Sequence, residues 1–310
     1  MKRISLIVPC YNEEETIGIF YKEIINYFNP QYDWQLIFVD DGSKDKSLAI
    51  MREYAQKDAR VHYVSFSRNF GKEAAMYAGL EACLKIKSDA AIIMDVDLQD
   101  DPKVIAQLTE AYEDGYNLIY TKHKNRKGSS KLKAFFSLAF YKVYAFVTKD
   151  KGMARGARDF SLMDKKVIKA FLQIKDYERF TKGIFHYVGF KTKCVEFEYH
   201  PRVAGKTKWS FRKLFHYALL GIREFSRFYE YIPKLFGWLT FFLLCFDLIY
   251  GAIKHNIDWH AIRLDALMLA VFISLFYLFR LIYDVRKQVQ NRPLYIAEES
   301  NIEDIDDETE

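Results

Sequence analysis

The stretch Ala90-Ala91-Ile92-Ile93-Met94-Asp95-Val96-Asp97-Leu98-Gln99-Asp100-Asp101-Pro102 carries the strongest structural signal in this sequence. It joins an apolar run typical of a buried strand to four aspartates and a proline that suits the first turn of a helix. Ligands of open α/β sheets bind just outside the carboxyl ends of the strands. Asp95 and Asp97 therefore predict a site for a divalent cation that bridges phosphates, because such cations prefer oxygen ligands. A solvated acidic turn is the alternative interpretation.

Strand and helix patterns alternate along the first 121 residues. Apolar runs predict strands at Ile4–Val8, Leu36–Val39, Val61–Phe66, Ala90–Met94 and Leu118–Tyr120. The intervening segments have helical character, at Glu14–Phe28, Lys46–Gln56, Lys72–Lys85 and Pro102–Asp114. Repeated strand-helix units favour an α/β fold with a Rossmann-like, mostly parallel sheet that is covered by helices on both faces.

Polar residues follow three of the other predicted strands as well. These segments are Pro9-Cys10-Tyr11-Asn12-Glu13-Glu14, Asp40-Asp41-Gly42-Ser43 and Ser67–Glu73. Each segment alone could be an ordinary turn into a helix. Together they place an aromatic ring, carboxylates and a cation at the same sheet edge as Asp95 and Asp97, which outlines a nucleotide diphosphate site. The sequence contains neither GxxxxGK[ST] nor GxGxxG, so a P-loop and a dinucleotide-binding turn are not indicated.

The order and spacing of these segments resemble those of family 2 glycosyltransferases with the GT-A fold. More narrowly, the chain is similar to the bacterial polyprenyl-phosphate glycosyltransferases, which are relatives of the bactoprenol glucosyltransferases and of dolichyl-phosphate mannose synthase. The similarity extends from Ile4 to Ile296. It includes four later motifs, at Arg158–Asp164, Arg179–Gly183, Ala204–Trp209 and Arg292–Ile296.

The resemblance implies a role for several groups of residues. The nucleotide-sugar would be bound by Pro9, Tyr11, Glu13, Asp40, Asp41, Lys72 and Asp95, although an ordinary surface lysine is an equal alternative for Lys72. Mg²⁺ or Mn²⁺ on the diphosphate would be held by Asp95, Asp97 and Gln99.

The catalytic and acceptor-side candidates also follow from the resemblance. Asp97 and Asp159 are the catalytic candidates, and Asp159 matches the family's acceptor-side carboxylate; a structural ion pair with Arg155 or Arg158 is the alternative for it. The acceptor phosphate would contact Arg126, Lys133, Arg202 and Lys206. His123 and Ala134 stand where family members usually carry basic residues, so these acceptor contacts are the weakest part of the correspondence.

Two amphipathic helices and two apolar spans are expected to bring the chain to a membrane. Residues 131–147 combine an apolar stripe with lysines, which fits an interfacial helix or a core-facing one, and residues 209–231 repeat the pattern. Leu235–Ile253 and Leu264–Tyr283 are each about long enough to span a bilayer, with buried helices of a soluble protein as the alternative. Asp247 within the first span favours contact with a helix or another subunit, so self-association is plausible.

These segments give four predicted regions. They are a catalytic GT-A domain at 1–208, a juxtamembrane helix at 209–231, a two-helix transmembrane hairpin at 232–285, and a disordered acidic tail at 286–310. Positive charge is denser on either side of the hairpin than within its loop, which predicts a protein of the bacterial inner membrane with both termini in the cytoplasm.

Composition is consistent with this assignment. The net charge is +5 although the tail from Ala297 is strongly acidic, so the rest of the chain is more basic and suits anionic lipid or phosphorylated substrates. The basic residues lie beside amphipathic helices rather than among stacking aromatic residues, which argues against nucleic acid. Cys10, Cys83, Cys194 and Cys245 have no CxxC spacing, so neither a disulfide framework nor a zinc site is indicated.

The predicted function is the inverting transfer of a hexose from a nucleotide diphosphate sugar to undecaprenyl phosphate, which makes a lipid-linked sugar donor for cell-envelope glycans. UDP-glucose and UDP-N-acetylglucosamine are the leading donors. A processive polysaccharide synthase is the nearest alternative, but the chain lacks the QxxRW motif and additional spans that such enzymes typically carry. A membrane-anchored scaffold with a degenerate nucleotide site is the other alternative, and the intact Asp95, Asp97 and Gln99 argue against it.

Overall fold

The computed structural model describes residues 1–124, 157–176, 179–198, 219–220, 235–240, 242, 245, 249, 259–289 and 292–302. The chain divides into two compact units. The first contains residues 1–139, 152–214 and 293–310, and the second contains residues 140–151 and 215–292. The acceptor-phosphate candidates Arg126, Lys133, Arg202 and Lys206 lie outside the described residues, as do the predicted helices at 131–147 and, for the most part, 209–231.

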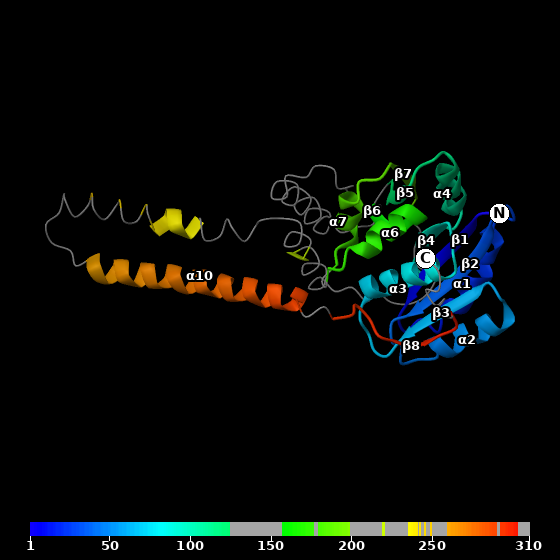
Figure 1. Ribbon diagram of the computed structural model, residues 1–310, viewed down its shortest axis with the longest axis horizontal. Coiled ribbons are helices and arrows are strands. Elements are labelled where there is room, and N and C mark those ends of the chain that lie inside the picture. Colours follow the sequence, from blue (N-terminus) through cyan, green and yellow to red (C-terminus); the bar gives the residue numbers. More distant parts are fainter. Residues whose placement is uncertain are drawn as a thin grey trace, which may run out of the picture. The chain divides into compact units, whose positions relative to one another are not determined.

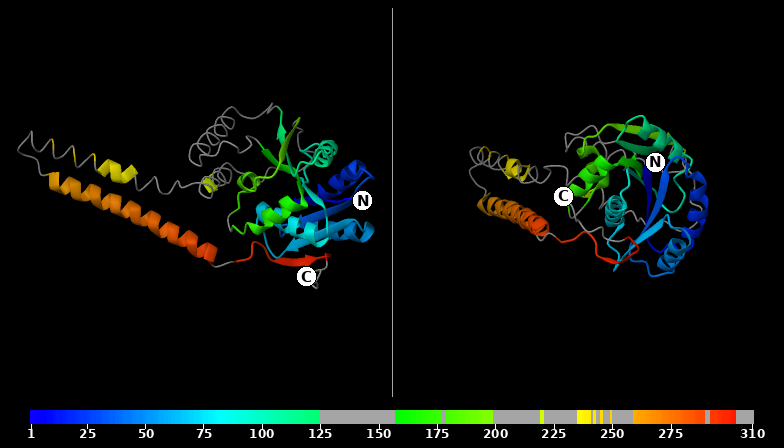
Figure 2. Two further views of the ribbon diagram at one scale, coloured as in Figure 1. Left: turned by 45° about the horizontal axis from the view of Figure 1, so that its top comes forward. Right: turned by 45° about the vertical axis from the view of Figure 1, so that its right-hand side comes forward.

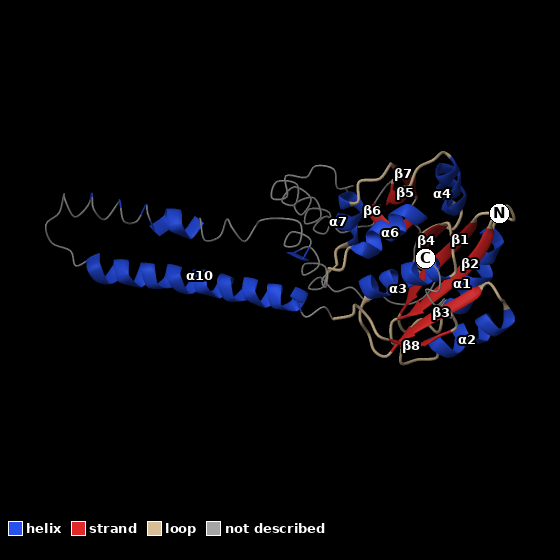
Figure 3. Cartoon of the chain, viewed as in Figure 1, coloured by secondary structure: helices blue, strands red, loops and turns tan. Residues whose placement is uncertain are grey.

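The first unit is built on an eight-stranded sheet with the order β7-β5-β6-β4-β1-β2-β3-β8 (Figure 3). Its strands are β1 (Arg3–Cys10), β2 (Asp33–Asp40), β3 (Val61–Phe66), β4 (Ala90–Ile93), β5 (Leu118–His123), β6 (Ala157–Asp164), β7 (Thr192–Phe197) and β8 (Ala297–Ser300). The adjacent strands β4, β1, β2 and β3 are parallel, so the carboxyl ends of these four strands meet at one edge. All five predicted strands are confirmed, and their boundaries differ by a few residues at most.

Helices alternate with the strands, and those up to residue 114 were predicted from the sequence, whereas the two described helices at Lys165–Gln173 and Thr181–Tyr187 were not. The helices are α1 (Ile17–Ile24) with the 3-10 turn η1 (Ile25–Tyr27), α2 (Ser47–Lys57), α3 (Lys72–Lys85), α4 (Val104–Glu113), α6 (Lys165–Gln173) and α7 (Thr181–Tyr187). The predicted helix at Glu14–Phe28 is shorter in the structure because its first residues form the turn that follows β1.

Alternation of side chains along the central strands places hydrophobic layers on both faces of the sheet. On one face, alternate residues of β1 such as Leu6 and Val8 join the core formed with Phe20 of α1, Met51 of α2 and Leu108 of α4. On the other face, α3 packs against β1 and β2 and contacts α6. Figures 1 and 2 show α3 on the side of the sheet opposite α1 and α2. This double cover explains why the central strands are almost continuously apolar.

Two strands run against the others, and neither of them, nor β7, was predicted from the sequence. Strand β6 is antiparallel to both β4 and β5, which brings its Arg158 and Asp159 beside the end of β4. Strand β8 is antiparallel to β3 and closes the edge of the sheet.

The prediction of a disordered tail is therefore wrong for residues 297–302. Asn301 accepts from the backbone N–H of Tyr63 at 2.7 Å, and Glu299 contacts both Arg52 and the Tyr63 hydroxyl. Just before the strand, Tyr295 stacks on Phe66 with ring centroids 4.8 Å apart. The acidic composition concealed a strand whose Glu299 carboxylate has partners on β3 and α2.

In the second unit, α10 (Trp259–Val289) is the long described helix. Its segment Ala266–Arg286 is long and apolar enough to cross a membrane, and none of that segment is buried by the protein. Most of the predicted first span, Leu235–Ile253, lies outside the described residues, so a two-helix hairpin stays a prediction.

Candidate active site

The loops at the carboxyl edge of the sheet are joined to one another by hydrogen bonds. The backbone N–H of Asp41 donates to the carbonyl of Cys10 at 2.8 Å, which ties the end of β2 to the end of β1. The Ser43 hydroxyl accepts from the backbone N–H of Asn12 at 2.8 Å, and Asn12 accepts in return from the N–H of Lys44 at 2.8 Å. These reciprocal bonds make the first two strand-end segments a single structural element.

The Asp40-Asp41 pair is buried at this edge and accepts hydrogen bonds from β3 and from the loops after β2 and β3. Asp40 accepts from the backbone N–H of Ser43 at 3.0 Å and from the hydroxyl of Ser65 at 2.8 Å. Asp41 accepts from the backbone N–H groups of Phe70 at 2.7 Å and Gly71 at 3.0 Å. Asp41 thereby fixes the loop that leads from β3 into α3.

Burial has an electrostatic cost at Asp41. It raises the pKa of this carboxyl to about 6, and the negative charge of Asp40 acts in the same direction. The hydrogen bonds from Phe70 and Gly71 and the charge of Arg68 oppose the shift without cancelling it. Asp41 is thus a carboxylate that the fold holds in place at the expense of stability near neutral pH, which is a common feature of functional sites.

Gly42 is required by the close approach of two loops. Its φ of +66° lies in the left-handed region, where a side chain is disfavoured. An added Cβ would also lie closer than 3.0 Å to the backbone of Arg68. The glycine of the Asp40–Ser43 segment therefore allows the loops after β2 and β3 to contact each other directly.

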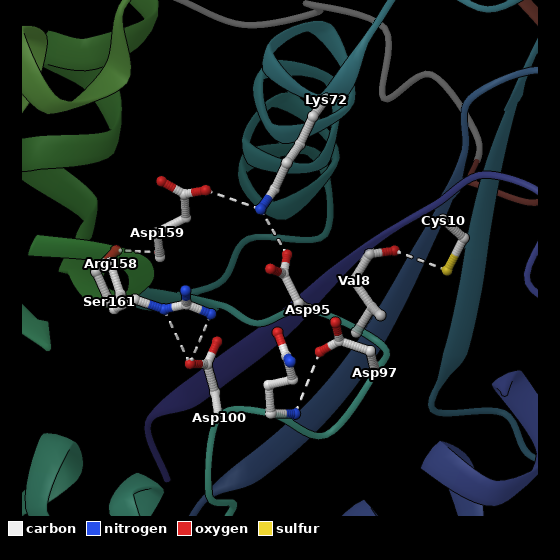
Figure 4. A network of polar contacts seen from close by, with 10 residues as sticks. Val8, Cys10, Lys72, Asp95, Asp97, Asp100, Arg158, Asp159 and Ser161 are labelled. Atoms are coloured by element: carbon white, nitrogen blue, oxygen red, sulfur yellow. Dashed lines mark hydrogen bonds and ion pairs between the residues drawn. The ribbon is translucent and has the colours of Figure 1, made fainter. Parts of the chain in front are cut away.

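Lys72, the first residue of α3, connects the ends of two further strands. Its ammonium Nζ lies 2.6 Å from Oδ1 of Asp95, just beyond β4, and 2.7 Å from Oδ2 of Asp159 on β6. Figure 4 shows this ammonium between the two carboxylates. Burial lowers the pKa of Lys72, but the charges of Asp159 and Asp95 outweigh burial and hold it above its ordinary value. Lys72 is therefore not an ordinary surface lysine, and it gives Asp159 an ion-pair partner that was not predicted from the sequence.

A second cation supports the turn that carries Asp97. Arg158 of β6 contacts the buried Asp100 through Nε at 3.2 Å and a terminal nitrogen at 3.1 Å (Figure 4). Burial raises the pKa of Asp100 to about 7, with Arg158 opposing the shift and Asp95 and Asp97 adding to it. Asp97 is itself nearly buried and accepts from the backbone N–H of Gln99 at 3.2 Å. The acidic turn is therefore packed into the fold, and a solvated acidic turn is excluded.

The donor atoms of this turn fit a metal that arrives with its substrate. No group of three or more His, Cys, Asp or Glu side chains within the described ranges could hold a metal ion by itself. Asp95 and Asp97 offer two carboxylates, and Mg²⁺ is often held by one or two carboxylates together with substrate phosphates. These residues are suited to a cation shared with a diphosphate rather than to a closed protein cage.

The structure gathers the described candidates at one edge of the sheet. Pro9 lies in β1, and Tyr11 and Glu13 follow it in a half-buried turn. Two supporting contacts were not predicted from the sequence, namely the Arg158–Asp100 pair and the contact of Glu73 in α3 with Thr181 in α7. Both lie in motifs named in the sequence analysis, but no spacing rule indicates which partner each residue has.

Comparisons with known proteins identify the family and agree with the fold. Residues 5–172 match the model of "Glycosyl transferase family 2". An uncharacterized glycosyltransferase of Synechocystis is 33% identical over 95% of this chain and 94% of its own. A prophage bactoprenol glucosyl transferase homolog of Escherichia coli is 37% identical over 81% of this chain and 80% of its own.

A solved structure shows the same fold at lower identity. Glucosyl-3-phosphoglycerate synthase from Mycobacterium tuberculosis, in complex with Mn²⁺ and UDP-glucose, aligns with a TM-score of 0.50 and 18% identity over 70% of this chain and 76% of its own. The family model covers more than half of the chain, and the first of the relatives covers nearly all of it. The chain therefore belongs to glycosyl transferase family 2, and it is a glycosyltransferase.

Proposed function

We propose that this glycosyltransferase moves a hexose from a UDP-sugar, with UDP-glucose or UDP-N-acetylglucosamine as the donor, to undecaprenyl phosphate in the bacterial inner membrane. The bactoprenol glucosyl transferase of Shigella phage SfX, at 36% identity, and the prophage bactoprenol glucosyl transferase homolog of E. coli, at 37%, support this acceptor class. The exposed apolar length of α10 supports a membrane location, with a hairpin whose two ends are cytoplasmic.

The observation that carries the proposal is the arrangement of Asp95 and Asp159 around Lys72. Asp95 belongs to the predicted diphosphate side of the site and Asp159 to the predicted acceptor side, and one ammonium contacts both. This shared contact supports a site in which the donor and the acceptor meet near Lys72. The buried Asp41 and the loops that it fixes would form the nucleoside end of the donor site.

The chemistry requires positioning more than proton removal. A phosphate acceptor is already ionised at neutral pH, so its oxygen can attack the sugar without a general base, and orientation supplies most of the rate. A divalent cation held by Asp95 and Asp97, with Gln99 nearby, would neutralise the departing nucleoside diphosphate. Asp159, oriented by Lys72, would hold the acceptor side of the site. The proposed acceptor-phosphate ligands are Arg126, Lys133, Arg202 and Lys206. In-line attack would invert the anomeric carbon.

Removing either proposed metal carboxylate tests the assignment. Asp95→Ala and Asp97→Ala should each lower transfer by about 10³-fold or more, because the leaving diphosphate would lose charge stabilisation. Transfer is measured as the mass of the glycosylated lipid formed from undecaprenyl phosphate and each UDP-sugar. Asp114→Ala, which removes an exposed carboxylate paired with Lys193, is the matched control and should retain full transfer. Undiminished, metal-dependent transfer by Asp95→Ala would refute the assignment.

A further inference from the structure

The contact of Lys72 with Asp95 conflicts with the proposed role of Asp95 as a metal ligand. The ammonium lies 2.6 Å from Oδ1 of that carboxylate, which is direct contact. A divalent cation on the same carboxylate would lie close to this unit positive charge, and like charges repel strongly at such separations. The lysine contact and a metal ion therefore compete for Asp95.

Lys72 can leave Asp95 without leaving the site. A lysine ammonium is a compact charge on a flexible four-carbon stem, so a small rotation moves it while its second contact, to Asp159 at 2.7 Å, is kept. The neighbouring Arg158 is different, because two of its nitrogens hold Asp100 in a fixed orientation. Among the described residues, the acidic turn is therefore contacted by a movable cation, Lys72, and by a fixed one, Arg158.

The position of α3 does not depend on Lys72 alone. The adjacent residue Glu73 accepts hydrogen bonds from the hydroxyl and the backbone N–H of Thr181 at the start of α7. Asp41 also accepts a hydrogen bond from the backbone N–H of Gly71, the residue that immediately precedes α3. Loss of the lysine charge should consequently leave the helix in place, so that the electrostatic role of Lys72 can be separated from a structural one.

We propose that Lys72 is a resident counter-ion that occupies the metal-binding carboxylate Asp95 until the UDP-sugar arrives, and so makes binding of the metal depend on binding of the donor. The diphosphate brings negative charge that compensates the ammonium, and the metal then takes its place on Asp95. Lys72 stays on Asp159 and keeps that carboxylate oriented. This inference rests on the proposed function, because it takes Asp95 as a ligand of a donor-bound metal.

The test compares Mn²⁺ binding with and without UDP-glucose. Free Mn²⁺ is measured by electron paramagnetic resonance in titrations of the detergent-solubilised full chain. Lys72→Met keeps the aliphatic stem and removes the charge. It should bind Mn²⁺ alone about tenfold tighter than the unmodified protein, a modest estimate for the loss of a unit charge in direct contact. The increase in Mn²⁺ affinity caused by UDP-glucose should shrink accordingly. Lys72→Arg, which retains the charge, should restore weak binding of Mn²⁺ alone.

Two controls separate the possible failures. Lys2→Met removes a lysine that pairs with Glu113 at 2.7 Å away from the site, and it should leave Mn²⁺ affinity unchanged. Asp95→Asn should lose the Mn²⁺ binding that UDP-glucose promotes; if it keeps that binding, the proposed metal site is wrong and the inference fails with it. If Asp95→Asn loses this binding but Lys72→Met binds Mn²⁺ alone no more tightly than Lys2→Met does, only the counter-ion role of Lys72 is overturned. Thermal unfolding shows that each variant is folded, and Lys72→Gln replaces Lys72→Met if the latter is not.

Discussion

The raised pKa of Asp41 predicts that this carboxylate destabilises the folded enzyme at neutral pH. In the folded chain its pKa is about 6, compared with 3.8 for an unperturbed aspartate. A group whose pKa is raised by folding carries no penalty below its unfolded value, and the penalty grows as the pH rises through the folded pKa. Asp41→Asn removes the charge and keeps an oxygen that can accept from Phe70 and Gly71. The stability difference between the two proteins should therefore depend on pH.

The size of the effect follows from the two pKa values. One pKa unit corresponds to about 1.4 kcal/mol, so ionised Asp41 costs the folded state about 1 kcal/mol at pH 4.5 and about 3 kcal/mol at pH 7.5. As the pH rises from 4.5 to 7.5, the free energy of unfolding of Asp41→Asn should therefore increase by about 2 kcal/mol relative to that of the unmodified protein. For a unit of this size that corresponds to a change of about 4 to 8 °C in the difference between the two melting temperatures.

Thermal unfolding of both proteins in the same detergent at several pH values measures this change. The new amide N–H₂ has its own desolvation cost, but that cost does not vary with pH and only offsets the whole curve. Titrating groups far from residue 41 are shared by both proteins and cancel in the difference. A difference in melting temperature that stays constant from pH 4.5 to 7.5 would show that the reasoning is wrong. We also expect Asp41→Asn to bind UDP more weakly, which would explain why a costly carboxylate stands at this position.

Two further predictions concern the loops and the closing strand. Gly42→Ala should lower the free energy of unfolding by about 2 to 4 kcal/mol, because left-handed backbone strain and overlap with Arg68 act together. Gly115→Ala, with a φ of +80° but open space around it, should cost only about 1 to 2 kcal/mol, and an equal loss in both variants in thermal melts would contradict the overlap argument. Tyr295→Ala should destabilise the first unit by about 2 to 4 kcal/mol, because it removes the stacking on Phe66 and a hydrogen bond to Glu81. Glu299→Gln should change the free energy of unfolding by about 1 kcal/mol at most, since the contact of Glu299 with Arg52 is screened by solvent. If Glu299→Gln destabilised the protein more than Tyr295→Ala, the conclusion that Tyr295 contributes more to stability would be wrong.

Local pattern was sufficient to predict the strands and helices up to residue 121 because each of them is amphipathic or continuously apolar over its own length. The same pattern could not reveal the direction of β6, since an antiparallel strand next to β4 has the same apolar alternation as a parallel one. It also could not reveal β8, where Ala297-Glu298-Glu299-Ser300 has low intrinsic strand propensity. That strand exists because the exposed edge of β3 provides hydrogen-bonding partners and because Arg52 lies where Glu299 can reach it.

The candidate site shows the same division between local and long-range information. The sequence predicted that carboxylates would meet at one sheet edge, because parallel strands bring their carboxyl ends together. It did not predict that Lys72 would contact Asp95 and Asp159, because these three residues come from α3, the end of β4 and β6 and are brought together only by the sheet order. An acidic pair after a strand is ambiguous in sequence for this reason. Its chemistry depends on which cation the rest of the fold places against it, and here that cation is one that a metal ion would have to displace.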